Sequence, residues 1–338
     1  MTKRKFPLGF AVRWLVALGL LALLCTQVPW SEVWSTMRAT PVWVLVAGVF
    51  LFVLVRWIMA LQMHVLLPDK ARRQVGVLSI LRIQMAAAFY GLILPGELAG
   101  GGVIWWKLSR VGAGPGRAGW MVVYLRITLL FGAAVLAVCG LLFNPALAFP
   151  GMLPILVGAV ALLLAGALVF VIPAWGRCFE SVFEACVSRF PLPQRLDRMA
   201  RAVPETLSSF REDHSGLEAV TQFLGSLIQN AFETFWFWVL AQALGIDVGF
   251  WNLAWIRGAL VFLQLLPITV GGLGVREISL VAMLGLLGIA EAPAVAFSLI
   301  IFAVTVCAGL IGFASEWGDW VRYRAAARAG EEALPPKS

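Results

Sequence analysis

Seven ionisable residues fall inside apolar runs of this sequence, and their side chains are the ones best placed to do chemistry. They are Arg56, Arg82, Glu97, Arg126, Glu233, Arg276 and Glu277. A charge among apolar groups is costly unless it is paired or bound to a ligand. Four arginines and three glutamates can pair with one another, which is one interpretation of the set. The other is phosphate binding, because a guanidinium presents a planar fork to phosphate oxygens.

Several of these residues adjoin two interruptions that share one pattern: a leucine–proline stop, a glycine cluster and a resumed apolar run. The first is Leu-Pro-Gly-Glu-Leu-Ala-Gly-Gly-Gly at 94–102, and the second is Leu-Pro-Ile-Thr-Val-Gly-Gly-Leu-Gly-Val-Arg-Glu at 266–277. Proline breaks a helix, and clustered glycine lets the backbone approach a ligand. A helix that restarts there would point free N–H groups at an anion. The predicted substrate-binding residues are Arg82, Pro95, Glu97, Gly100, Gly101, Arg126, Glu233, Pro267, Gly271, Gly272, Gly274, Arg276 and Glu277.

The composition is typical of a polytopic membrane protein. Of the 338 residues, 61% are hydrophobic and 13% are charged, about half the charged share of a soluble domain. The formal net charge of +8 does not indicate nucleic-acid binding, because the basic residues lie in short loops between apolar spans. We predict an all-α transmembrane helix bundle. Its full spans would be Leu8–Val28, Pro41–Leu67, Ala118–Phe143, Met152–Pro173, Leu217–Leu244 and Ala294–Ser315.

The loop charges predict the topology, since Lys and Arg mark the cytoplasmic side. Basic residues within 3–5, 70–73 and 322–328 place both termini in the cytoplasm of a multi-pass inner-membrane protein. The interrupted segments, Val75–Leu108 and Leu253–Leu287, would then enter from opposite sides as re-entrant hairpins, an inverted repeat of the kind that transporters use. Each segment is also long enough for one full crossing, so spanning helices with short returns are the alternative.

The domain organisation follows from these spans. We predict one transmembrane domain over residues 1–338, with two inverted halves at about 1–173 and 217–315. A polar linker at 177–214 joins them, and its apolar spacing predicts two amphipathic helices at the cytoplasmic surface. Those helices either pack on the bundle or contact anionic lipid. We expect no soluble catalytic domain.

Enzymatic signatures are weak in this sequence. It contains no H-E-x-x-H, no G-x-S-x-G, no P-loop and no acidic cluster with metal-ligand spacing. We therefore expect a transporter rather than an enzyme, with no cofactor and no metal. Without a nucleotide-binding motif, transport would be driven by a gradient or have no driving force of its own.

The motifs resemble those of the lysylphosphatidylglycerol synthase transmembrane-region family of flippase-like proteins, over nearly the whole chain. The likeness rests on both interruptions, above all the second, and on Val122-Val123-Tyr124-Leu125-Arg126. By this resemblance, the residues at family motif positions are Arg126, Pro267, Gly272, Gly274, Arg276 and Glu277. The chain departs from the pattern after its first glycine cluster, where Lys107 is the next cation, and at Leu125, where an aspartate commonly stands.

The resemblance implies a lipid translocator without the soluble aminoacyltransferase domain of the bifunctional members. The substrate would be an anionic or aminoacylated phospholipid, or a lipid linked to polyprenyl phosphate. Arg126 and Arg276 would hold the phosphate, and Glu97 or Glu277 would balance charge. Two alternatives stay open: a membrane-embedded transferase that uses a lipid-linked donor, and a scaffold for a lipid-modifying partner enzyme. A homodimer is a further partner to test, and no nucleic-acid partner is expected.

Overall fold

A computed structural model describes residues 30–93, 98–144, 152–189, 194–212, 216–265 and 274–328. These ranges contain thirteen α-helices, a π-helical turn at Ser109–Ala113 and no strand, which confirms the all-α prediction. The helices are α2 (Trp30–Ala39), α3 (Val42–Val65), α4 (Asp69–Gln74), α5 (Val77–Ile93), α6 (Leu98–Leu108), α7 (Pro115–Phe143), α8 (Met152–Leu168), α9 (Pro173–Arg189), α10 (Gln194–Glu212), α11 (Gly216–Ala243), α12 (Phe250–Gln264), α13 (Val275–Gly285) and α14 (Glu291–Arg328).

Three helices in the described ranges are long and apolar enough to cross a bilayer. They are α3, α7 and the part of α14 from Glu291 to Gly318. All three coincide with predicted spans. Helix α8 joins α9 through a bend of 93°, so this pair counts as a fourth, broken span at most. The predicted span Leu8–Val28 lies outside the described residues.

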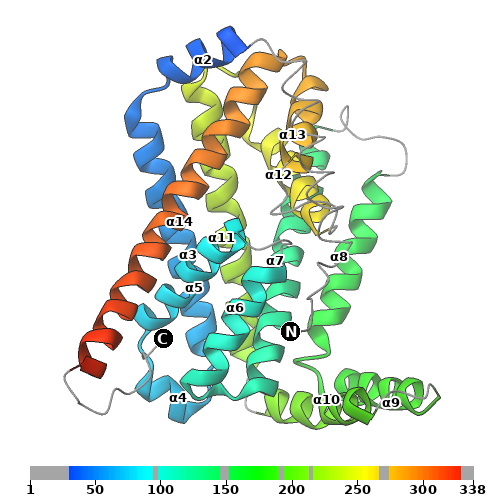
Figure 1. Cartoon of the computed structure of the whole chain (residues 1–338). Helices are drawn as coiled ribbons and strands as arrows, with labels where there is room; N and C mark the ends of the chain where they lie inside the picture. The colour runs from blue at the N-terminus through cyan, green and yellow to red at the C-terminus, as the bar shows by residue number, and fades with distance from the viewer. Residues whose placement is uncertain are drawn as a thin grey trace, which may run out of the picture.

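Helix α11 differs from the apolar span predicted at Leu217–Leu244. It is 28 residues long, but it is not among the described helices that are apolar enough to qualify as a candidate span. The reason is a row of buried polar side chains, which we call the polar face of α11: Gln222, Ser226, Gln229, Asn230 and Thr234. In Figure 1, α11 runs through the length of the bundle, and it contacts α3, α7 and α12. Its polar face is therefore turned toward protein rather than lipid.

The two interrupted segments form two helix pairs. Val75–Leu108 becomes α5 and α6, and Leu253–Leu287 becomes α12 and α13. Figure 1 shows the first pair mainly in the lower half of the bundle, with α4, and the second in the upper half, with α2. Within the two interruptions, residues 94–97 and 266–273 lie outside the described residues. Re-entry from opposite sides and the inverted repeat therefore stay predictions.

The linker forms the two predicted amphipathic helices, α9 and α10. Helix α10 packs on the bundle: Leu207 and Phe210 are fully buried, and Nε1 of Trp120 donates to Oγ1 of Thr206 at 3.0 Å. Helix α9 instead exposes apolar side chains such as Phe179 and Val182. Helix α10 thus packs on the bundle, and lipid contact stays a prediction for α9.

Candidate functional site

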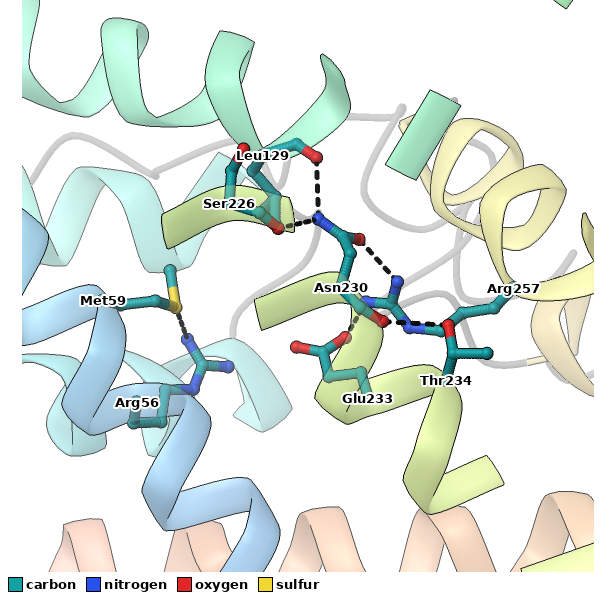
Figure 2. Close-up of polar contacts among 8 residues, drawn as sticks. All are labelled: Arg56, Met59, Leu129, Ser226, Asn230, Glu233, Thr234 and Arg257. Atoms are coloured by element: carbon teal, nitrogen blue, oxygen red, sulfur yellow. Dashed lines mark hydrogen bonds and ion pairs between the residues drawn. The ribbon is translucent and has the colours of Figure 1, made fainter. Parts of the chain in front are cut away.

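A polar network at the centre of the bundle is built around Arg257 of α12. Its side chain is 5% exposed, although it lies between apolar neighbours in sequence. Nη1 of Arg257 donates to Oδ1 of Asn230 at 2.5 Å, and Nη2 forms an ion pair with the carboxylate of Glu233. Figure 2 shows both contacts, which join α12 to α11. The sequence analysis named Glu233 but missed Arg257.

Asn230 orients this guanidinium because its own amide is fixed. Nδ2 of Asn230 donates to the carbonyl oxygens of Leu129 at 3.1 Å and Ser226 at 2.8 Å. The hydroxyl of Thr234 donates to the Asn230 carbonyl at 2.9 Å. With both amide hydrogens engaged, the amide oxygen faces Arg257. Helices α7, α11 and α12 therefore meet at one hydrogen-bonded point (Figure 2).

Two glycines let these helices approach closely enough to form the network. A Cβ at Gly132 of α7 would lie 2.8 Å from Nδ2 of Asn230, and one at Gly258 of α12 would lie 2.5 Å from Cβ of Ala137. Small residues at helix crossings are the usual means of close packing in membranes. The position of the network thus depends on the crossings of α7 with α11 and with α12.

The network is open on the side of Glu233, whose side chain is 34% exposed. In Figure 2 the guanidinium of Arg56, on α3, points toward the same space between α3 and α11. Nη1 of Arg56 contacts Sδ of Met59 at 3.7 Å, and its Cζ lies 4.9 Å from the centre of the Phe52 ring. Helix α3, which packs against α11, thus carries a second arginine.

A second polar group lies at the start of α13. Glu277 is 3% exposed, and its Oε2 accepts a hydrogen bond from the Gly274 N–H at 2.7 Å. Its Oε1 accepts from Nη2 of Arg276 at 2.5 Å and from Nε at 3.1 Å. The carboxylate of Glu277 thus occupies the helix start that was predicted to bind an anion, and it engages the fork of Arg276.

The chain matches the family model described as lysylphosphatidylglycerol synthase TM region over residues 10–312. It belongs to that family. No curated protein and no solved structure matches it. The family comprises membrane proteins that act in lipid modification or translocation, so this chain is a multi-pass membrane protein of that class.

The predicted site residues of this family member are only partly brought together. Arg276, Glu277 and Gly274 form one group, whereas Glu233 belongs to the Arg257 network. Arg126 of α7 is half-buried, and Arg82 of α5 is exposed. Outside the described residues lie Pro95, Glu97, Pro267, Gly271 and Gly272.

Gly100 and Gly101 serve helix packing in the described structure. Both lie in the first turn of α6. A Cβ at Gly100 would lie 3.4 Å from the Ala87 carbonyl oxygen of α5, and one at Gly101 would lie 3.4 Å from the Val122 side chain of α7. These are contacts between helices, so close approach to a ligand stays a prediction for these two residues.

Lys107, expected near the cytoplasmic end of its segment, is instead buried. Its side chain is 7% exposed, and Nζ lies 2.6 Å from Oε1 of Glu316. The pair joins α6 to α14. The residue that departs from the family pattern therefore stabilises the bundle through an ion pair that the sequence analysis did not identify.

Gly274 is expected to be irreplaceable by a residue with a side chain. Its φ of 83° and ψ of −51° lie in a region that L-residues rarely adopt. We expect Gly274→Ala to lower the free energy of unfolding by about 1–3 kcal/mol. The measurement is the melting temperature of the detergent-purified protein. Gly285→Ala is the control, since Gly285 ends α13 with open space around it. Equal melting temperatures for both variants would contradict the strain assigned to Gly274.

Proposed function

We propose that this protein moves a phosphate-bearing membrane lipid between the two leaflets. The observation that carries the proposal is the buried guanidinium of Arg257, which Asn230 holds in place and Glu233 neutralises. A guanidinium fork suits phosphate oxygens, and ionisable residues inside a membrane protein mark substrate paths. The family, which acts in lipid modification or translocation, supports a lipid as the substrate.

In this mechanism the lipid phosphate replaces the Glu233 carboxylate on Arg257. Glu233 is the partner free to leave, because its side chain is 34% exposed and that of Arg257 is 5% exposed. Asn230 keeps its hydrogen bond to Nη1 during the exchange, so the fork stays oriented. The headgroup then crosses beside the polar face of α11 while the acyl chains remain among the lipid tails.

In this proposal Arg257 has the phosphate-binding role that the sequence analysis assigned to Arg276. The Nε and Nη2 groups of Arg276 already bind Glu277, and the same carboxylate receives the Gly274 N–H. Removing Glu277 from this arrangement would leave the start of α13 without its cap. In our proposal Arg276 therefore stabilises the second interruption, and Arg126 remains the second candidate for the phosphate.

The test is lipid movement in reconstituted vesicles. The purified protein is placed in vesicles that contain fluorescent phosphatidylglycerol, and a membrane-impermeant quencher reports the label that reaches the outer leaflet. We expect Arg257→Lys to move lipid about tenfold more slowly than the wild type, because an ammonium cannot reproduce the fork. Arg211→Lys is the matched control, since the ion pair of Arg211 with Glu180, at 3.0 Å, joins α9 to α10 away from the network.

Three outcomes would count against the proposal. Wild-type vesicles that move lipid no faster than empty ones would exclude translocation under these conditions. Equal rates for Arg257→Lys and Arg211→Lys would exclude Arg257 as the phosphate ligand. A covalently altered lipid in the vesicles, detected by mass spectrometry, would favour the transferase alternative.

A further inference from the structure

Charged residues of α11 lie near both ends of its polar face. Glu218 precedes Gln222 by one turn, and Glu233 follows Asn230 by less than one turn. From Glu218 to Glu233 the helix rises about 22 Å, most of the thickness of a bilayer core of about 30 Å. Gln222, Ser226, Gln229 and Asn230, which lie between them, are all at most 3% exposed. A continuous row of polar groups thus crosses the interior of the bundle.

Two small cavities lie on this row. One is lined by Leu66, Tyr124, Glu218 and Ala219 among others, and the other by Gln62, Thr128, Ser226 and Gln229 among others. Each has a volume of about 10 Å³, which is the space of about one water molecule. The first cavity lies beside Glu218, one helical turn before Gln222. The second lies beside Ser226 and Gln229, between Gln222 and Asn230. Each cavity is lined by at least one buried polar side chain of another helix: Tyr124 in the first, and Gln62 and Thr128 in the second.

Buried polar atoms on or beside the row lack a hydrogen-bond partner within the described part of the chain. They are Oε1 of Gln222, in the row itself, and Oη of Tyr124, a residue of α7 that lines the first cavity. Nε2 of Gln222 donates to the Gln62 carbonyl and Nε2 of Gln62 donates to the Gln222 carbonyl, both at 3.0 Å, so the two amides are held in place. A buried acceptor without a partner is costly, and water commonly supplies the missing bond. The two cavities therefore have room for one water molecule each, and Gln222 lies between them along α11.

We propose that this row is a proton path that leads from the end of the bundle at α4 to Glu233. At its outer end, Oε1 of Glu218 lies 3.9 Å from Nη1 of Arg72 in α4. The inference rests on the proposed function, since Glu233 needs a proton only when a lipid phosphate has taken its place on Arg257. A hydronium ion at the α4 end gives up the proton and becomes water, and one Glu233 carboxylate oxygen receives the proton and becomes a neutral carboxylic acid. Arg257 keeps its charge, and the lipid keeps its phosphate diester.

The charged groups around Glu233 agree with this role. Helix α12 contributes Arg257, and α3 contributes Arg56 (Figure 2). Helix α7 reaches the network through the Leu129 carbonyl, and its nearest charged residue along the chain, Arg126, lies three residues earlier. The Glu233 carboxylate thus has Arg257 as its ion-pair partner, and it loses that partner when the phosphate binds. Its protonation leaves Arg257 as the one charge that balances the phosphate diester while the lipid is bound.

The test measures proton uptake when phosphatidylglycerol is added to the purified protein in weakly buffered detergent with a pH indicator. We expect the wild type to take up about one proton per chain, the capacity of one carboxylate, and Glu233→Gln to take up none. Tyr124→Phe removes only the unpartnered hydroxyl, so it should fold normally and take up the same amount. Its uptake should be roughly fivefold slower, as for the loss of one hydrogen-bonded link, and Gln222→Leu should act likewise.

The matched control is Gln84→Leu. Gln84 is also fully buried, and its Oε1 is also without a partner in the described structure, but it lies on α5 and not on the row. Its proton uptake should keep the wild-type rate. No uptake by the wild type, uptake that survives Glu233→Gln, or equal rates for Tyr124→Phe and Gln84→Leu would overturn the path. Lipid movement without uptake would overturn the path alone, and uptake without lipid movement would overturn the proposed function alone.

Discussion

Replacing Gly312 by leucine is expected to prevent the bundle from assembling. Gly312 lies where α14 crosses α5, and a Cβ built there would overlap the carbonyl oxygen of Met85. One turn earlier, a Cβ at Gly309 would overlap the Leu92 side chain. A carbonyl oxygen on a helix cannot turn aside as a side chain can, so the two helices must separate. Overpacking of this kind costs about 3 kcal/mol or more.

The measurement is the fraction of folded protein after detergent extraction, followed by size-exclusion chromatography and thermal melting. We expect Gly312→Leu to give little folded protein and Gly312→Ala to melt several degrees below the wild type. Gly158→Leu is the control, because Gly158 is an exposed position on α8 with nothing within 4 Å of a built Cβ. A normal yield of Gly312→Leu would show that α14 and α5 can separate without loss of the fold.

The apolar spans were predictable because they depend on local composition. Helices α3 and α7 begin and end within three residues of the predicted spans. Helix α2 was not predicted, because its tryptophans suit an aromatic belt equally well. What makes this segment a packed helix is Val33, which lies against Val295 and Ala296 of α14. Such a contact joins segments far apart in sequence, so hydropathy along the chain does not reveal it.

The candidate site was predictable in its residue types but not in its pairings. Arg257 carried the same signal as Glu233, a charge within an apolar run, and counting charges inside the second interrupted segment would have found it. The pairing of Arg276 with Glu277 is less expected, since neighbouring residues on a helix do not face each other. The pairing of Lys107 with Glu316, 209 residues apart, depends on how α6 meets α14.

The two partners of the Arg257–Glu233 pair differ in solvent exposure, and this difference decides how much stability each substitution should cost. Arg257 is 5% exposed, so Glu233→Gln leaves a buried cation with only neutral acceptors. We expect that variant to lose about 3–5 kcal/mol of folding free energy. Glu233 is 34% exposed, so Arg257→Gln leaves a carboxylate that water can reach, and solvent screening reduces the loss to about 2 kcal/mol.

The double variant Arg257→Gln/Glu233→Gln separates a structural role from a functional one. The double variant leaves neither partner as an uncompensated buried charge, so it should melt within a few degrees of the wild type. Its lipid movement should nevertheless stay at the level of empty vesicles, because no guanidinium remains to bind the phosphate. The melting curves of the wild type, the two single variants and the double variant give the coupling energy between Arg257 and Glu233.

The same cycle at Arg211 and Glu180 provides the comparison. Their side chains are 10% and 17% exposed, so the double variant Arg211→Gln/Glu180→Gln should also recover the stability that each single variant loses. Because this pair joins α9 to α10 outside the network, its double variant should keep wild-type lipid movement. If Arg257→Gln/Glu233→Gln regains lipid movement together with stability, the central pair is structural, and the phosphate must bind elsewhere.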